Sequence, residues 1–161
     1  MHARAEDIIV LLALARHPES GYFRQVHKSQ LLVTPTDGRS NRSALTIIYF
    51  LLDEGSVSRW HQVLSDEAWH YYEGSPLELF VAPPEGGAAL SSTLGPLAED
   101  SRPLHVVPAG WWQAARPRGP YTLVACSVGP GFEFADFTLL SDLSIAERPV
   151  SDPEDLVKAF L

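Results

Sequence analysis

The residues best suited to chemistry lie in one stretch, 58–74, where imidazole, carboxylate, guanidinium and aromatic side chains alternate along two β-prone segments. Strand side chains alternate between two faces, so Arg59 and His61 share one face of the first segment. By the same rule, Glu67, Trp69 and Tyr71 share one face of the second. If the segments pair, His61 and Glu67 converge. An imidazole beside a carboxylate can exchange a proton or coordinate a metal, so we predict these two as the catalytic pair, with Trp69 and Tyr71 lining the site.

Several other side chains are candidates for ligand binding. Gln113 offers an amide oxygen and amide donors, and Trp111 can wall a pocket on the same face. Arg24 and Arg59 are candidate anion binders, because a guanidinium suits bidentate capture of a carboxylate or phosphate. Glu133 lies in an aromatic segment that can close over one end of the fold. The plainer alternatives are core packing for Gln113 and Trp111, surface ion pairs for the arginines, and a solvated acid for Glu133.

Short β-prone segments bounded by turn residues recur along most of the chain, and helical patterns occur only near its ends. The helices are predicted at 5–16 and 152–161, the second opening with an N-cap and a proline at its first position. The polar run 34–43 is predicted to be a mobile loop. This pattern favours an all-β barrel or jelly roll. The predicted strands are 21–27, 44–52, the two segments of 58–74, 76–82, 88–94, 104–108, 111–115 and 121–128.

Composition limits the classes of protein that fit. A chain of 161 residues that is 45% hydrophobic fills one core, so we expect a single domain over 1–161. The formal charge of −8 disfavours a nucleic-acid partner. The single cysteine, Cys126, lies in an apolar run where a thiol packs as a small hydrophobe, and this usage fits a reducing compartment. The apolar run 8–15 is shorter than the roughly 20 residues of a membrane span, and the start lacks signal-peptide features, so a cytoplasmic location is expected.

Two motifs carry a family resemblance. His61, then Glu67 six residues on, then Gly74 seven residues later, resemble the first motif of the cupins. The run Pro108-Ala109-Gly110-Trp111-Trp112-Gln113 is similar to the second cupin motif, with Gln113 at the position of the usual third histidine ligand. The chain resembles most closely the small subfamily called cupin family five, whose signatures match 17–24, 48–52, 58–74, 107–115 and 129–137.

The resemblance implies a cupin-type double-stranded β-helix, that is, a jelly-roll barrel, with short N- and C-terminal helices. It also implies a metal set of His61, Glu67 and Gln113. Because this set holds one strong nitrogen ligand and one carboxylate, we expect no firm cofactor and at most a weakly bound divalent metal. Cupins often pair through their sheets. Trp60, Tyr72 and the set 47–49 also supply more large apolar side chains than a barrel of this size can face inward, so a homodimer is predicted.

Three functions remain open at this point. The first is an isomerase or epimerase that acts on a sugar derivative or another small polar or anionic metabolite, with His61 or Glu67 moving the proton and Arg24 holding an anionic group. The second is a non-catalytic cupin that binds a sugar or small acid through the same residues. The third is a metal-dependent oxygenase or decarboxylase.

Overall fold

The computed structural model describes residues 1–18, 20–148 and 159–161. One α-helix, α1 (Ala3–Leu11), precedes the strands within these residues, and short 3₁₀ turns follow the last long strand. The strands are β1 (Ala15–Arg16), β2 (Tyr22–Lys28), β3 (Leu32–Val33), β4 (Arg42–Ser43), β5 (Thr46–Asp53), β6 (Ser58–Val63), β7 (Asp66–Gly74), β8 (Leu77–Ala82), β9 (Leu90–Leu94), β10 (Leu104–Val107), β11 (Trp112–Pro117), β12 (Tyr121–Gly129) and β13 (Phe137–Leu139). The 3₁₀ turns are η1 (Phe134–Asp136), η2 (Leu140–Asp142) and η3 (Ile145–Glu147).

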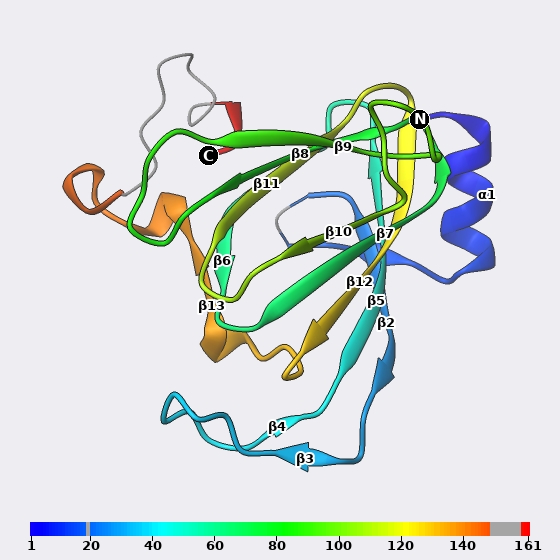
Figure 1. Ribbon diagram of the computed structural model, residues 1–161. Coiled ribbons are helices and arrows are strands. Elements are labelled where there is room, and N and C mark those ends of the chain that lie inside the picture. The colour runs from blue at the N-terminus through cyan, green and yellow to red at the C-terminus, as the bar shows by residue number, and fades with distance from the viewer. Residues whose placement is uncertain (19, 149–158) are drawn as a thin grey trace.

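Two antiparallel sheets face each other and enclose the core (Figure 1). The larger sheet has the order β1-β2-β5-β12-β7-β10, and the smaller has the order β13-β6-β11-β8-β9. Consecutive strands often lie in different sheets, as in a jelly roll, where the chain crosses between layers. The main hydrophobic cluster between the layers includes Phe50, Trp69 and Val124. The predicted all-β jelly roll is therefore confirmed.

The centre of the larger sheet is formed by the two most apolar segments of the chain. Strand β12 lies between β5 and β7, and most of its side chains are buried. A strand covered on both faces has no polar face, which explains the nearly continuous apolar runs that predicted β5 and β12. On the outer side of this sheet, Ala5 and Ile8 of α1 pack against Leu51 and Tyr121.

The N-terminal helix is shorter than predicted. It ends at Leu11 rather than at Arg16, and Ala13 adopts a positive φ of 50°. Ala15 and Arg16 then leave the helical path and pair with β2 as strand β1. Local helix propensity is a weak preference, and here hydrogen bonds to a sheet edge override it.

The run 34–43 was predicted to be a mobile loop, but its last two residues form strand β4. Strands β3 and β4 make a separate two-stranded ribbon that projects from the lower end of the barrel in Figure 1. The side chain of Arg42 is buried in β4, so the run is anchored to the body of the protein. For the predicted C-terminal helix, residues 152–158 lie outside the described part of the chain.

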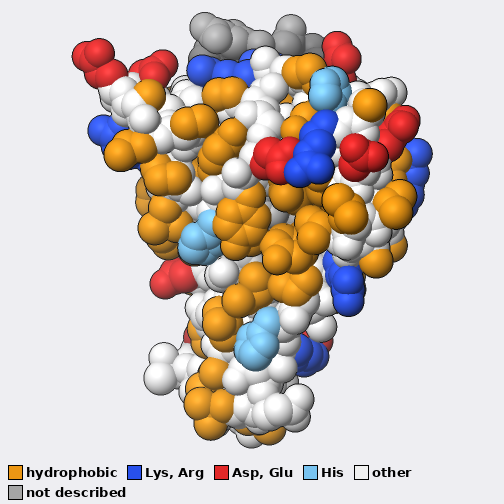
Figure 2. Space-filling view, turned by 90° about the vertical axis from the view of Figure 1, so that its right-hand side faces the viewer, with side chains coloured by type: hydrophobic (Ala, Val, Ile, Leu, Met, Phe, Trp, Pro, Cys, Tyr) orange, Lys and Arg blue, Asp and Glu red, His pale blue; other side chains and the backbone are white. Residues whose placement is uncertain are grey.

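Hydrophobic side chains also gather on the surface. Figure 2 shows them across the face that carries α1 and the outer side of the larger sheet. Tyr72 is 54% exposed there and contacts Tyr49 edge to face, with ring centroids 6.0 Å apart. Trp60, which was counted with Tyr72 in the predicted interface, is instead buried against Phe80 and Phe160. No helix in the described residues is long and apolar enough to cross a membrane.

Candidate functional site

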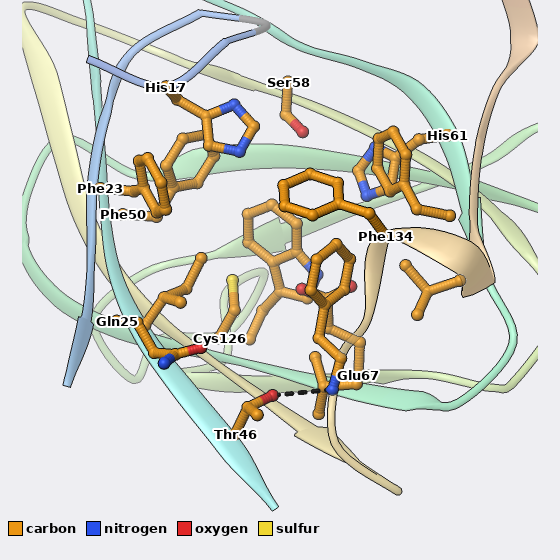
Figure 3. Close-up of a pocket in the computed structure, with 16 residues that line it drawn as sticks. His17, Phe23, Gln25, Thr46, Phe50, Ser58, His61, Glu67, Cys126 and Phe134 are labelled. Carbon is orange, nitrogen blue, oxygen red and sulfur yellow. Dashed lines mark hydrogen bonds between the residues drawn. The ribbon is translucent and has the colours of Figure 1, made fainter. Parts of the chain in front are cut away.

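A cavity of about 170 Å³ opens between the two sheets at one end of the barrel (Figure 3). Apolar side chains make up most of its wall, and six of them are aromatic, namely Phe23, Phe50, Trp69, Phe132, Phe134 and Phe137. Ile48, Val63 and Val128 complete the apolar lining. The groups able to form hydrogen bonds are His17, Gln25, Thr46, Ser58, His61, Glu67 and Cys126. Both members of the predicted pair, His61 and Glu67, are thus buried side chains on the wall of one cavity.

A β-bulge in β6 decides which side chains of that strand face the cavity. Gln113 of β11 pairs with His61 and Ala115 pairs with Ser58, so three steps along β6 match two along β11. The extra residue reverses the alternation, as a bulge does. Ser58 and His61 therefore both line the cavity, whereas Arg59, which simple alternation placed beside His61, does not.

The bulge also fixes the orientation of His61. Its Nδ1 lies 2.7 Å from the carbonyl oxygen of Arg59. A carbonyl oxygen can only accept a hydrogen bond, so Nδ1 carries the proton and donates it, which leaves Nε2 as an acceptor. The ring stacks on Phe137, with centroids 5.3 Å apart. The pKa of His61 is lowered to about 4, mainly by burial and also by nearby His17, while the bond to Arg59 opposes this shift, so the imidazole is neutral at pH 7.

Glu67 is held from behind by a chain of buried hydrogen bonds. The indole Nε1 of Trp69 donates to Oε1 of Gln113 at 2.8 Å, and Nε2 of Gln113 donates to Oε2 of Glu67 at 2.6 Å. Because an indole N–H can only donate, it must face the amide oxygen, which fixes the orientation of the amide. Burial raises the pKa of Glu67, opposed by hydrogen bonds from Gln113 and from the thiol of Cys126. The carboxyl therefore has hydrogen-bond partners that favour its ionised form but, among the described residues, no cationic one.

Cys126 lines the cavity beside Glu67. Its thiol is buried, and burial together with the negative charge of Glu67 raises the pKa of the thiol well above its usual value. A thiol with a raised pKa remains protonated and is a poor nucleophile. Cys126 thus acts as a small hydrogen-bond donor, in agreement with the predicted buried cysteine.

His17 is a cavity residue that the sequence prediction did not select. It packs edge to face on Phe23, with centroids 4.8 Å apart, and lies 5.4 Å from Phe50. Burial lowers the pKa of its imidazole. In Figure 3, Ser58 is drawn between His17 and His61 along one side of the cavity. The available signal was the first family-five signature, which begins at this histidine, but His17 directly follows the predicted helix rather than a strand.

Six residues predicted to contact a ligand do not line the cavity, and two of them, Arg59 and Gln113, have been described above. Arg24 points away from it and donates to the carbonyl oxygen of Leu12 at 3.1 Å. Glu133 pairs with Lys28 at 2.8 Å on the surface. Tyr71 and Trp111 pack against the main hydrophobic cluster. Tyr71 keeps the predicted face of β7 but lies further along the barrel, where its hydroxyl donates to the carbonyl of Gly74 at 2.6 Å.

One wall of the cavity is formed by a short aromatic segment that includes η1. Phe132, Phe134 and Phe137 come from this segment, and Phe134 remains 70% exposed although it lines the cavity. Asp136 fixes the segment in place, since its carboxylate accepts two bonds of 2.8 Å from Arg42 and one of 2.8 Å from Arg39. The β3–β4 ribbon and this segment therefore stabilise each other.

The residues implied as metal ligands do not fit a metal. The oxygen of Gln113 is occupied by Trp69, and its amide nitrogen faces Glu67. A metal would require that oxygen to be free, because an amide nitrogen that donates cannot be a ligand. The described residues also contain no group of three His, Cys, Asp or Glu side chains placed to hold a metal ion. Gln113 instead positions Glu67 and Trp69.

The side chains of the site can form hydrogen bonds with a small molecule and exchange protons with it. His61 offers an unprotonated nitrogen, Ser58 offers a hydroxyl, and Glu67 offers a carboxyl whose protonated form is favoured by burial. No arginine or lysine lines the cavity among the described residues, so it provides no fixed positive charge for an anion. An apolar wall with a few polar groups is typical of a small-molecule site.

Comparison with known proteins identifies the family. Residues 6–140 match the model of the cupin superfamily (DUF985). A protein of Shewanella oneidensis, solved by X-ray crystallography, is 33% identical over 97% of this chain and 96% of its own, with a TM-score of 0.82. A hypothetical protein from Leishmania major is 30% identical over 89% of this chain and 94% of its own, with a TM-score of 0.77.

More distant structures share the fold alone. An oxalate decarboxylase from Bacillus subtilis has a TM-score of 0.58 at 14% identity, over 79% of this chain and 30% of its own. No curated protein matches the chain. The family model spans most of the sequence, and the similar structures cover nearly all of the fold; the chain therefore belongs to the cupin superfamily.

Proposed function

We propose that this chain binds a small uncharged molecule in the barrel cavity and moves a proton on it, as an isomerase does. The observation that supports this most is the pair of buried titratable groups without a countercharge. The pKa of His61 is lowered to about 4 and that of Glu67 is raised, so burial favours the neutral form of both. Two groups whose surroundings push their pKa values in opposite directions supply an acid and a base in one site.

The proposed step uses both groups on the ligand. The protonated carboxyl of Glu67 donates its proton to one ligand atom, and Nε2 of His61 accepts a proton from another. The ligand gains one proton and loses one, so it leaves as an isomer of the same charge. A carboxylate and an imidazolium remain in the cavity, and transfer of one proton from His61 to Glu67 through water restores the starting state.

The geometry changes the ligand expected from sequence. The sequence predicted that Arg24 or Arg59 holds an anionic group of the ligand, but neither side chain lines the cavity. A buried anion without a cationic partner is strongly disfavoured. We therefore favour a neutral ligand. A metal-dependent oxygenase or decarboxylase loses support as well, because Gln113 is committed to Trp69 and Glu67.

Binding without catalysis is the alternative, and one observation favours it. Glu67 already accepts hydrogen bonds from Gln113 and Cys126, so its carboxyl can serve mainly to anchor the network around Trp69. In that case His61 would accept a hydrogen bond from the ligand and no proton would move.

Hydrogen exchange separates the two functions. A panel of small carbonyl and enol compounds is incubated with the protein in D₂O, and deuterium incorporation at carbon is followed by NMR. We expect exchange with the native chain and with Glu133→Gln, whose acid lies outside the cavity, and at least tenfold slower exchange with Glu67→Gln and His61→Asn, equivalent to about 1.4 kcal/mol. Binding with no exchange above the buffer rate would establish the non-catalytic function instead.

We further propose that the chain forms a homodimer through the outer side of its larger sheet. Tyr72 is the extra residue of a bulge in β7 and is 54% exposed, in contact with the half-buried Tyr49, and the half-buried Ile47 lies two residues before Tyr49 on β5. Large apolar side chains on an exposed sheet face favour association. Light scattering at micromolar concentration should give twice the mass of one chain, and Tyr72→Glu should give the monomer. A native monomer under these conditions would contradict the proposal.

A further inference from the structure

The composition of the cavity wall restricts its ligand beyond the proposed function, on which this inference rests. Apolar groups form most of the wall, and six of the lining side chains are aromatic. A sugar carries a hydroxyl on nearly every carbon, and each would need a partner once it is buried. Seven lining side chains can form hydrogen bonds, but most of the surface that the wall presents to the cavity is apolar. The wall therefore disfavours the sugar derivative that the sequence suggested.

The size of the cavity sets the scale of the ligand part that it can bury. Its volume is about 170 Å³. A cavity of about 150 Å³ lined by apolar side chains accommodates benzene. The cavity thus has room for one six-membered ring and a small substituent. Flat aromatic walls also suit a ring, because rings pack favourably on one another in offset or edge-to-face arrangements.

The polar side of the cavity indicates which substituent the ring carries. Nε2 of His61 can only accept a hydrogen bond, because the bond to Arg59 places the proton on Nδ1. Ser58 is buried beside it, and Figure 3 draws no hydrogen bond from its hydroxyl to the other lining residues. A serine hydroxyl can both donate and accept. A ligand hydroxyl that donates to His61 and accepts from Ser58 satisfies both groups, whereas a carboxylate would face the lone pair of Nε2.

We propose that the cavity binds a neutral single-ring molecule with one hydroxyl or enol group, directed at Ser58 and His61. The ring packs among Phe50, Trp69 and Phe134. Phe134, at 70% exposure, lies at the mouth through which such a ligand enters. An enol on a ring is also a group on which a proton can move to carbon, which connects this ligand class to the proposed isomerase.

The test uses four probes, namely phenol, toluene, benzoate and glucose, with binding measured by ¹H–¹⁵N NMR on the native chain. Phenol is expected to shift the indole resonance of Trp69, which lines the cavity, and to leave that of Trp60, which packs outside it. Toluene should bind about fivefold more weakly, the effect of one neutral hydrogen bond. Benzoate should bind at least tenfold more weakly than phenol, and glucose should cause no shift.

Ser58→Ala and the matched control Ser91→Ala, an exposed serine on β9, test the predicted hydrogen bond. Ser58→Ala should weaken phenol binding about fivefold and leave toluene binding unchanged, and Ser91→Ala should change neither. Millimolar phenol without a shift at Trp69, or glucose or benzoate binding more tightly than phenol, would overturn the inference. If phenol binds but no compound of the carbonyl and enol panel exchanges deuterium, the ligand class stands and only the isomerase is contradicted.

Discussion

Two buried carboxylates, Asp136 and Glu67, lie in opposite surroundings. Asp136 is 3% exposed and Glu67 is 7% exposed, so burial alone does not distinguish them. Asp136 is bound by the guanidinium groups of Arg39 and Arg42, and the bond to Arg42 is the main cause of its lowered pKa. Glu67 faces an amide and a thiol, and burial raises its pKa. Asp136 is therefore paired with cations, whereas Glu67 has no cationic partner among the described residues.

Substitution of Asp136 should have the largest effect on folding. Asp136→Asn removes the negative charge that compensates the buried Arg42, and a buried charge without its partner is strongly destabilising. We expect the free energy of unfolding to fall by roughly 3 kcal/mol in urea denaturation. The matched control is Glu133→Gln, which breaks only an exposed pair with Lys28 and should cost less than about 1 kcal/mol. Equal midpoints for the two variants would mean that the cluster around Asp136 does not hold the ribbon.

The second prediction concerns the loss of stability as pH falls, caused by His61, which lies in the same cavity as Glu67. The folded-state pKa of about 4 lies below the usual histidine value of 6.5, so the unfolded chain takes up the proton first as pH falls. Stability contributed by the neutral imidazole is therefore present above pH 6.5 and is lost as pH falls toward 4. From pH 7 to pH 5 the loss amounts to about 2 kcal/mol, at 1.36 kcal/mol per pKa unit.

The variant His61→Asn isolates this loss. Its unfolding free energy should decrease less than that of the native chain over the same interval, because Asn does not titrate. Glu67 acts in the other direction, since a raised pKa makes acid favourable to the folded state, but that contribution is shared by both proteins. Parallel pH profiles for the native chain and His61→Asn would show that the imidazole is not held neutral.

Substitution of Glu67 should affect stability less than substitution of Asp136. Glu67→Gln keeps the size of the side chain and an oxygen that can accept from Gln113, so the unfolding free energy should change by only about 1 kcal/mol. Binding of the ligand or the rate of deuterium exchange should fall at least tenfold. Thermal melting is measured beside the binding assay. A loss of stability as large as that of Asp136→Asn would make Glu67 a structural residue and remove the contrast.

The smallest expected effect concerns the thiol partner of Glu67. Cys126→Ala removes a hydrogen bond that favours the ionised carboxyl, so the pKa of Glu67 should rise further. A ¹³C NMR titration of the side-chain carboxyls measures this change, and the resonance of Asp136 in the same spectra is the control. A pKa of Glu67 that falls on removal of the thiol would contradict the assigned hydrogen bond.

Local patterns were sufficient to predict much of the fold. Continuous apolar runs predicted the central strands β5 and β12, and alternation placed His61 and Glu67 inside the barrel, where both are buried. Each of these inferences depends on side-chain periods within one segment, which the sequence displays directly. The family motifs added the jelly-roll architecture, which a single period cannot provide.

Features that depend on distant pairing were missed. Arg42 and Asp136 are 94 residues apart, so their ion pair has no local signal, and the run 34–43 was predicted to be mobile. The bulge in β6 arises from its register with β11, and alternation therefore misplaced Arg59. His17 reaches the cavity because β1 pairs with β2, where a helix had been predicted. Tertiary contacts override local preference in all three cases.

The bulge in β6 makes the charge of the cavity sensitive to the register of one strand. Three steps of β6 match two of β11, and this single surplus residue places Ser58 inside and keeps Arg59 out. If β6 paired with β11 without the bulge, regular alternation from His61 would put a guanidinium on the cavity wall in place of a serine hydroxyl. The bulge therefore keeps a fixed positive charge off the wall, although an arginine stands only two residues from His61 in the sequence.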